Sequence, residues 1–172
     1  MANFRLKNVL IAKLAGWFPA LGRKLTEGYR PTAVAAAVPW QRLDKPVRDC
    51  RIALVTTAGI HHNTQQPFDM QDADGDPTFR VIDASASWGD FTITHDYYDH
   101  ADADKDPNII LPLDRLKEFV SAGEVGELAP RHYSFMGHIV GRHLPTLVEN
   151  SAVTVAEELL ADQVDLVILS PG

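Results

Sequence analysis

The stretch Val164-Asp-Leu-Val-Ile-Leu-Ser-Pro-Gly172 organises the interpretation of the whole chain. Apart from Asp165 it is a short apolar run, rich in β-branched residues, that is closed by Pro171 and Gly172. This pattern is typical of a buried parallel strand that leads into a loop. In open α/β sheets, the loops at the carboxyl ends of the strands hold the ligand. We therefore expect a functional edge beside Gly172, and we expect that the sequence is truncated there or that another chain completes the edge.

Other candidate elements precede this strand. Residues 146–161 have the pattern of a helix, with expected core positions Leu147, Val148, Val155, Leu159 and Leu160. Residues 112–120 predict a second helix, which Gly123 follows as a terminator. Residues 51–57, 79–83 and 91–94 predict strands. This order of elements predicts an α/β layered sandwich with a mainly parallel β-sheet.

The amino-terminal part differs in composition. Residues 3–25 predict a basic amphipathic helix with apolar positions Leu6, Val9, Leu10, Leu14, Trp17 and Phe18. A proline-rich linker follows over residues 28–47, so we divide the chain into an arm (1–47) and an α/β domain (48–172) that is incomplete at its carboxyl terminus. The helix either covers the domain's own core or lies on a membrane surface or a partner.

Composition restricts the classes of function. The 172 residues are 45% apolar and carry 16 Lys and Arg against 23 Asp and Glu, a net charge of −7. This charge argues against a protein that binds nucleic acid electrostatically. No apolar run is long enough to cross a bilayer, and the single cysteine, Cys50, is typical of a reducing compartment. We expect a cytoplasmic protein in which Cys50 is a structural side chain.

Histidines follow two of the predicted strands. His61 and His62 follow residues 51–57, and the segment His95-Asp-Tyr-Tyr-Asp-His100 follows residues 91–94. If both strands are parallel members of one sheet, these side chains gather at its carboxyl edge. There they can bind zinc or iron beside Asp96 or Asp99, or serve as acid–base groups. No HExxH motif is present, so we favour a polar substrate or catalytic pocket over a metal site.

Other motifs are missing or incomplete. The acidic segments 69–77 and 102–106 lack essential ligands of an EF-hand, so we expect solvated turns there. The chain contains no dinucleotide-binding GxGxxG, no P-loop and no GxSxG motif, and Ser134 is a weak candidate for a nucleophile. Residues 131–138 show no clean periodicity. The residues alone indicate a site lined by His, Tyr and Asp whose nucleophile has not been found.

Four segments carry a resemblance to a known family. They are residues 52–61, the run from Thr94 through Asn108 to Leu116, residues 131–138 and residues 164–172. In this order they resemble the selenoprotein B family of glycine, sarcosine, betaine and D-proline reductases, most closely its short members similar to D-proline reductase. The resemblance covers about residues 48–172 and leaves the amino-terminal arm out.

The resemblance implies a redox function. Family members carry selenocysteine, or in some cases cysteine, immediately after the strand that corresponds to residues 164–170. Selenocysteine is encoded by UGA, so an end at Gly172 is what a misread selenocysteine codon produces. On this expectation the chain is the amino-terminal part of a reductase subunit that cleaves a carbon–nitrogen bond in an amino acid or its N-methylated derivative. As written, it lacks the redox residue and is inactive.

The resemblance also implies partners and candidate residues. The substrate is a small molecule similar to an amino acid, a dithiol restores the redox residue, and a partner subunit contributes a pyruvoyl group in the glycine and D-proline types. A homo- or hetero-oligomer is expected, with no cofactor or metal in this chain. The catalytic candidates are His61, His95, Asp96 and His100. The candidates for substrate binding are Tyr97, His62 and His132.

One alternative function belongs to another class. The chain could be a non-catalytic α/β protein that ends at Gly172 and binds a small molecule or a metal. A metal-dependent enzyme that uses the His and Asp loops is a second alternative.

Overall fold

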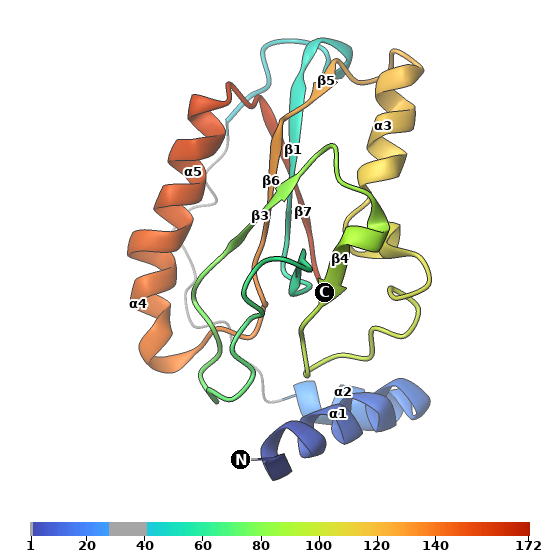
Figure 1. Cartoon of the computed structure of the whole chain (residues 1–172), viewed down its shortest axis with the longest axis vertical. Helices are drawn as coiled ribbons and strands as arrows, with labels where there is room; N and C mark the ends of the chain where they lie inside the picture. Colours follow the sequence, from blue (N-terminus) through green and yellow to red (C-terminus); the bar gives the residue numbers. More distant parts are fainter. Residues whose placement is uncertain (1, 28–40) are drawn as a thin grey trace.

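A mainly parallel sheet with helices on both faces forms the body of the protein (Figure 1). The structure is a computed structural model that describes residues 2–27 and 41–172. The α/β sandwich expected from the order of elements is therefore confirmed. Most of the predicted linker, residues 28–40, lies outside the described residues.

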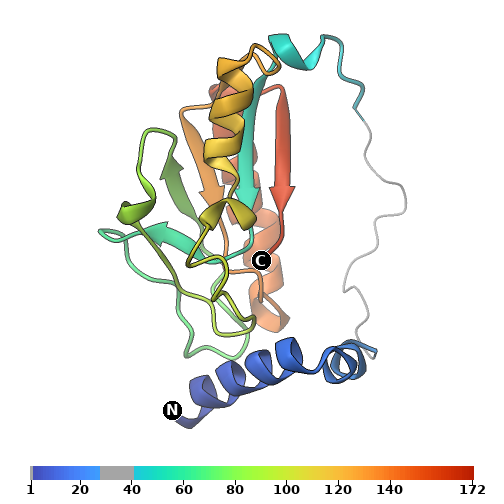
Figure 2. The same cartoon turned by 90° about the vertical axis from the view of Figure 1, so that its right-hand side faces the viewer.

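The main sheet is built around β1 (Arg51–Thr56). On one side β1 pairs in parallel with β7 (Leu166–Ser170), and on the other with β5 (Glu127–Leu128) and β6 (Arg131–Ser134). The strand β3 (Arg80–Asp83) pairs antiparallel with β6 at the opposite edge from β7 (Figure 2). Because β1 has neighbours on both sides, its residues 52–54 are buried almost completely.

A bulge separates β5 from β6. Ile52 faces Leu128 and Val55 faces Tyr133, so three steps along β1 correspond to five steps along its neighbour. The two extra residues open a gap in the ladder of backbone hydrogen bonds, as bulges do. The imidazole of His132 fills this gap, because its Nδ1 accepts a hydrogen bond of 3.0 Å from the Leu54 N–H.

The predicted strand at residues 91–94 does not belong to the main sheet. It forms β4 (Phe91–Ile93), which pairs antiparallel with β2 (Ile60–His62) in a separate two-stranded sheet. The expectation that residues 51–57 and 91–94 are parallel strands of one sheet is therefore wrong. Gly59, whose φ is +70°, allows the chain to turn out of β1 into β2.

Helices cover each face of the sheet. On one face α3 (Leu113–Ser121) buries Leu113 and Leu116 against the first apolar core, which also contains Cys50 and Leu54. The other face carries α4 (Leu144–Thr146), a π-helical turn (Leu147–Ser151) and α5 (Ala152–Ala161). Short 3₁₀ turns occupy Val47–Asp49, Trp88–Asp90, Pro107–Ile109 and Gly141–His143.

Two expected core positions of the helix at residues 146–161 are wrong. Val148 is 60% exposed and Leu160 is 75% exposed, whereas Val155 is buried. The π-helical turn holds one more residue per turn than an α-helix, so it rotates Val148 away from the face that carries Val155. Leu160 follows Val155 by five residues, a spacing that places it on the far side of an α-helix.

The carboxyl-terminal strand is an edge strand and not a fully buried one. Within the described residues β7 pairs with β1 alone, and its residues alternate between half-buried and exposed. Leu169 is 75% exposed, so the expectation of a buried strand is wrong on one face of the sheet.

The amino-terminal arm forms α1 (Ala2–Trp17) and α2 (Pro19–Thr26), which lie below the carboxyl ends of β1, β6 and β7 (Figures 1 and 2). The expected helix is confirmed, but its apolar side chains do not cover the core. The exposed ones include Leu6, Leu10, Trp17 and Phe18, all at least 57% exposed. No helix in the described part of the chain is long and apolar enough to cross a bilayer.

Candidate active site at the carboxyl edge of the sheet

The carboxyl ends of three parallel strands meet at one point. The N–H of Gly172, beyond β7, donates a hydrogen bond of 3.2 Å to Oγ1 of Thr57, which directly follows β1. Gly137, beyond β6, approaches the same residue, because a Cβ added to Gly137 would lie 2.7 Å from the Thr57 carbonyl oxygen. This edge is where an open α/β sheet places its ligand.

His95 lies at this meeting point. A Cβ on Gly137 would also lie 3.3 Å from Nε2 of His95, which is only 5% exposed. The short β2–β4 sheet brings His95 here, since the Thr94 N–H donates to the carbonyl oxygen of Gly59, just beyond β1, at 2.8 Å. His95 therefore reaches the carboxyl edge of the main sheet by a different route from the one predicted.

The protonation of His95 follows from its surroundings. Burial, assisted by the nearby His138, lowers the pKa of His95 from 6.5 to about 4, although Asp96 opposes the shift. The imidazole is therefore neutral at pH 7. Its Nδ1 accepts a hydrogen bond of 3.1 Å from the Tyr97 N–H, so Nε2 carries the proton and faces the strand ends as a neutral donor.

Two tyrosines pack around His95. The ring of Tyr98 meets the imidazole edge-on at 4.7 Å, and its hydroxyl donates to the Ala58 carbonyl oxygen at 3.1 Å. Burial raises the pKa of Tyr98, which keeps the phenol neutral. Tyr97 stacks on His138 at 4.0 Å, and its hydroxyl is buried. These contacts hold the orientation of the imidazole.

Asp96 ties the site to the amino-terminal helix. Its carboxylate, 8% exposed, accepts from Nε of Arg5 at 2.6 Å and from a second guanidinium nitrogen at 3.1 Å. This is a two-point ion pair between α1 and the segment that carries His95. The predicted catalytic candidate Asp96 thus holds α1 across the edge.

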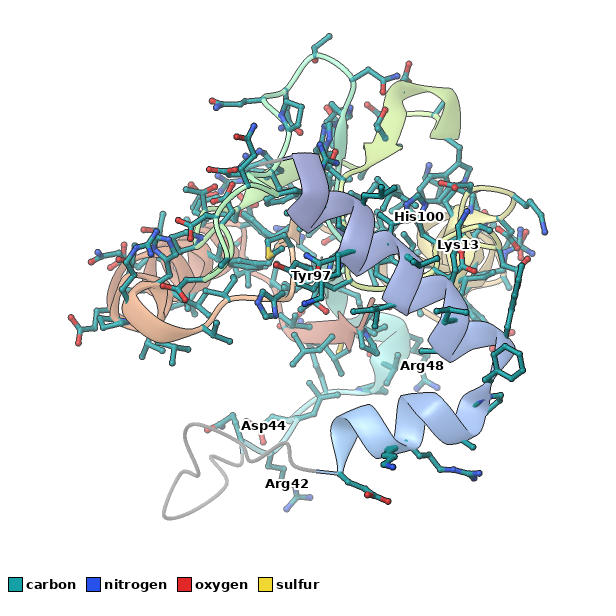
Figure 3. The ribbon with its side chains drawn as sticks, turned by 90° about the horizontal axis from the view of Figure 1, so that it is seen from below. Lys13, Arg42, Asp44, Arg48, Tyr97 and His100 are labelled. Carbon is teal, nitrogen blue, oxygen red and sulfur yellow. The ribbon has the colours of Figure 1, made fainter. Side chains whose placement is uncertain are left out.

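A cavity of about 190 Å³ lies between α1 and the segment after β4. The carboxylate of Asp104 pairs with Nδ1 of His100 at 2.8 Å on one wall, and Lys13 of α1 forms part of another. Figure 3 shows Lys13, His100 and Tyr97 around α1 as seen from below. The cavity thus offers both a cation and carboxylates, and its lining is Val9, Lys13, His95, Tyr98, Asp99, His100, Ala101 and Asp104.

His61 and His62 lie in the small sheet, where hydrogen bonds hold their rings. The Nδ1 and Nε2 of His61 contact the His62 carbonyl oxygen at 2.8 Å and Thr94 Oγ1 at 2.9 Å. Nε2 of His62 accepts from the Asp83 N–H at 3.3 Å, and its ring packs on Phe91. Neither residue lines the cavity beside Lys13.

His132 and Cys50 lie away from this cavity. His132 is fully buried inside the sheet, where burial lowers its pKa from 6.5 to about 4. Cys50 is fully buried at the opposite end of β1 from Thr57, and its thiol donates to the Pro46 carbonyl oxygen at 3.3 Å. The structural role predicted for Cys50 is confirmed.

The acidic segments form hydrogen-bonded turns, but the expectation that they are solvated is wrong at Asp76, which is buried. The carboxylates of Asp69, Asp72 and Asp76 each accept a backbone N–H two residues further on, at 2.7, 3.0 and 2.9 Å. Asp102 and Lys105 form an exposed ion pair. Within residues 2–27 and 41–172, no group of three or more His, Cys, Asp or Glu side chains is arranged to hold a metal ion.

Four of the seven predicted site residues share the segment beneath the strand ends: His95, Asp96, Tyr97 and His100. Sequence reasoning missed Arg5, Lys13 and Gly137. Gly137 stands inside the segment 131–138, but α1 reaches the site only through tertiary packing. No spacing in the sequence relates Lys13 to His100.

Comparison with known proteins identifies relatives. The sequence model described as Glycine/sarcosine/betaine reductase selenoprotein B (GRDB) matches residues 6–171. The match includes the arm, so the expectation that the arm lies outside the resemblance is wrong. The chain is 34% identical over 133 residues to D-proline reductase subunit gamma of Acetoanaerobium sticklandii, which covers 77% of this chain and 53% of that protein.

Two further relatives come from Peptoclostridium acidaminophilum. The sarcosine reductase complex component B subunit beta is 31% identical over 158 residues, covering 87% of this chain and 34% of that protein. The betaine reductase complex component B subunit beta is 31% identical over 150 residues, covering 79% and 30%. The chain thus spans between about a third and half of these relatives, and no solved structure matches it. The chain belongs to the glycine/sarcosine/betaine reductase selenoprotein B family.

Proposed function

We propose that this protein is a subunit of a reductase complex that reductively cleaves a carbon–nitrogen bond in an amino acid or its N-methylated derivative. The single observation that supports this most is the family match over residues 6–171. The curated relatives are named as D-proline, sarcosine and betaine reductase subunits. The proposed partners are a pyruvoyl-bearing subunit and a dithiol reductant in a cytoplasmic hetero-oligomer.

The redox group of this proposal lies outside residues 1–172. Cys50 is the only cysteine, and it is buried at the amino end of β1. Six residues of β-strand place it about 20 Å from the carboxyl edge. A selenocysteine or cysteine directly after Gly172 would enter the edge beside Thr57, which the backbone of Gly137 also approaches closely.

Such a group would supply a nucleophile that displaces the amine from carbon. A dithiol would then reduce the resulting adduct with two electrons and become a disulfide. The residues of this chain surround the redox group. The neutral His95 directs its Nε2–H towards the strand ends, where it would stabilise a selenolate or thiolate. Asp96 and Tyr97 hold the segment in place, and His100 with Asp104 is the group that moves protons at the cavity.

The cavity fits a small zwitterion. Lys13 would pair with the substrate carboxylate, while Asp99 and Asp104 face the nitrogen. His61, His62 and His132 have no such position, because their imidazoles are engaged within the two sheets.

The test is anaerobic turnover by the protein produced from the whole reading frame together with its partner subunits. Glycine, sarcosine, betaine and D-proline are supplied separately with dithiothreitol, and amine release and thiol oxidation are measured. We expect turnover of one substrate and a loss of about 100-fold in His95→Phe, with partial activity in His95→Gln, which keeps an N–H donor. Turnover of none of the four substrates would count against the proposal.

Two outcomes favour the alternatives. A UAA or UAG codon after the codon for Gly172 would exclude a selenocysteine there. Binding of an amino acid by the 172-residue chain, with no turnover in any longer form, would favour a non-catalytic binding protein.

A further inference from the structure

An apolar groove runs between α5 and β7. It has a volume of about 320 Å³ and is lined almost entirely by apolar side chains. Thr57 and Gly137 line its lower end, so the groove opens into the carboxyl edge described above. The lining residues are Val55, Thr57, Phe135, Gly137, Ile139, Leu147, Ala152, Val155, Ala156, Leu159, Val167 and Leu169.

The two faces of β7 differ in their cover. Leu166 and Ile168 pack on the apolar core around Cys50 and are half-buried. Val167 and Leu169 face the groove and are 37% and 75% exposed. An exposed apolar edge strand of this kind is a site for the addition of a further strand. The uncovered parts of β7 are therefore the face that lines the groove and the outer edge of the strand.

The groove has the width of a helix. α5 is held over β6, because Arg131 forms ion pairs with Glu158 and Asp162, and Tyr133 donates to Glu158 at 2.8 Å. Among residues 2–27 and 41–172, this leaves β1 and β7 without a helix on that face. Each strand takes up about 4.8 Å of the width of a sheet, so β1 and β7 together are about as wide as one helix, roughly 10 Å. Ala152 and Ala156 form the wall of α5, and small side chains there let a second helix approach closely.

The handedness of the fold selects this same face. The chain leaves β6, passes through α5 and enters β7, which lies beyond β1 in the sheet. Crossovers between parallel strands are almost always right-handed. A helix and strand that follow β7 and add the strand outside β7 would extend the sheet in the direction that leads from β6 to β7. This helix must therefore lie on the α5 face, directly over the groove.

We propose that the groove and the outer edge of β7 receive a helix and a parallel strand from polypeptide that continues beyond residue 172. The helix begins at Thr57 and Gly137, covers Val167 and Leu169, and leads into a strand beside β7. The length of the relatives supports this occupant, since the match covers only 53% of D-proline reductase subunit gamma. The inference needs polypeptide beyond Gly172, as the proposed function does, but it needs no particular chemistry.

The experiment compares two lengths of the protein. One is the 172-residue chain, and the other is the product of the whole reading frame, with cysteine encoded at any in-frame UGA. Leu169→Glu is expected to lower Tm of the longer protein by about 6 °C or more, because the carboxylate is buried there, and to change Tm of the shorter one by less than about 2 °C. Leu160→Glu is the matched control, since Leu160 is also 75% exposed but does not line the groove.

Hydrogen exchange gives a second measurement that needs no variant. In the longer protein, peptides that cover residues 164–172 are expected to exchange at least tenfold more slowly than in the 172-residue chain. Equal exchange in the two lengths, or equal effects of Leu169→Glu on both, would overturn the proposal. So would a dimer of the 172-residue chain that Leu169→Glu dissociates, because the occupant would then be a second copy. The proposed function fails separately, if the longer protein shows this protection but turns over no substrate.

Discussion

At the scale of single residues, the side chain of His132 replaces a backbone carbonyl as a hydrogen-bond acceptor in the sheet. The bulge between β5 and β6 removes a carbonyl acceptor from the ladder, and Nδ1 of His132 accepts the Leu54 N–H in its place. An unsatisfied N–H at the centre of the sheet would cost about 1–3 kcal/mol. This contact explains why a fully buried histidine stands in a central strand of the sheet.

His132→Leu is expected to lower the free energy of unfolding by about 2 kcal/mol, because the buried Leu54 N–H loses its acceptor. His132→Asn keeps an acceptor near the position of Nδ1 and is expected to cost less. Urea denaturation measures both. Equal losses in the two variants would show that packing volume, and not the hydrogen bond, is what His132 contributes.

Gly137 offers a second test at this scale. Its φ of +80° is a conformation that favours glycine, and a Cβ there would lie 2.7 Å from the carbonyl oxygen of Thr57. Gly137→Ala is therefore expected to cost several kcal/mol in stability and to reduce turnover by the longer protein. Gly123→Ala is the control, because its φ is +73° and no atom lies within 4 Å of the added Cβ. If thermal unfolding shows the same loss in both variants, backbone strain alone explains the effect.

At the scale of elements, polar side chains help to fix α1 at the site. Its residues Arg5 and Lys13 face the site, whereas Leu6 and Leu10 are more than half exposed. Polar contacts therefore contribute to holding the helix in place, and such contacts weaken as salt rises. The outward apolar side chains form an exposed apolar surface on α1.

Arg5→Met is expected to loosen α1 by removing the ion pair with Asp96. Because Arg5 is half exposed, we expect a modest effect, with chymotrypsin cleavage near Trp17 about threefold faster. Raising the salt concentration to about 1 M should speed cleavage of the unaltered protein in the same direction. Lys7→Met, at an exposed position of the same helix, is the control. Equal cleavage of both variants would argue against the ion pair.

At the scale of the whole molecule, two buried histidines couple stability to pH. The pKa values of His95 and His132 are both lowered to about 4 by burial, from an ordinary value near 6.5. Protons therefore bind to the unfolded chain first as the pH falls. The stabilisation is complete above pH 6.5 and is lost between pH 6.5 and 4.

The free energy of unfolding is expected to fall over this window by about 3 kcal/mol for each histidine, or about 1.4 kcal/mol per pH unit. Ion pairs and hydrogen bonds lower the pKa values of carboxylates such as Asp72 and Asp162. The stabilisation that these carboxylates provide is therefore lost only at a lower pH than that of the histidines. Urea titrations from pH 7 to pH 4 measure the slope. His132→Asn should remove about half of it, and an unchanged slope in that variant would contradict the assignment.

The sequence alone determined the layered α/β class, the strand at residues 51–56, the helix at residues 113–121 and the family. Each of these rests on local periodicity or on long matching segments. The position of β6 escaped prediction, because a central strand with a bulge and a buried histidine has no alternating pattern. The exposure of Val148 was not predicted for a similar reason, since a pattern of period 3.6 does not indicate a π-helical turn.

The sequence predicted only part of the candidate site. The segment that begins at His95 stood out by composition, but its place at the sheet edge depends on the separate β2–β4 sheet. Lys13 and Arg5 reach it across more than 80 residues of chain, through packing that no local pattern encodes. The strand at residues 166–170 was recognised from its residues, but which of its two faces is open was not. Burial depends on which strands and helices lie beside a strand, and only the tertiary structure decides that.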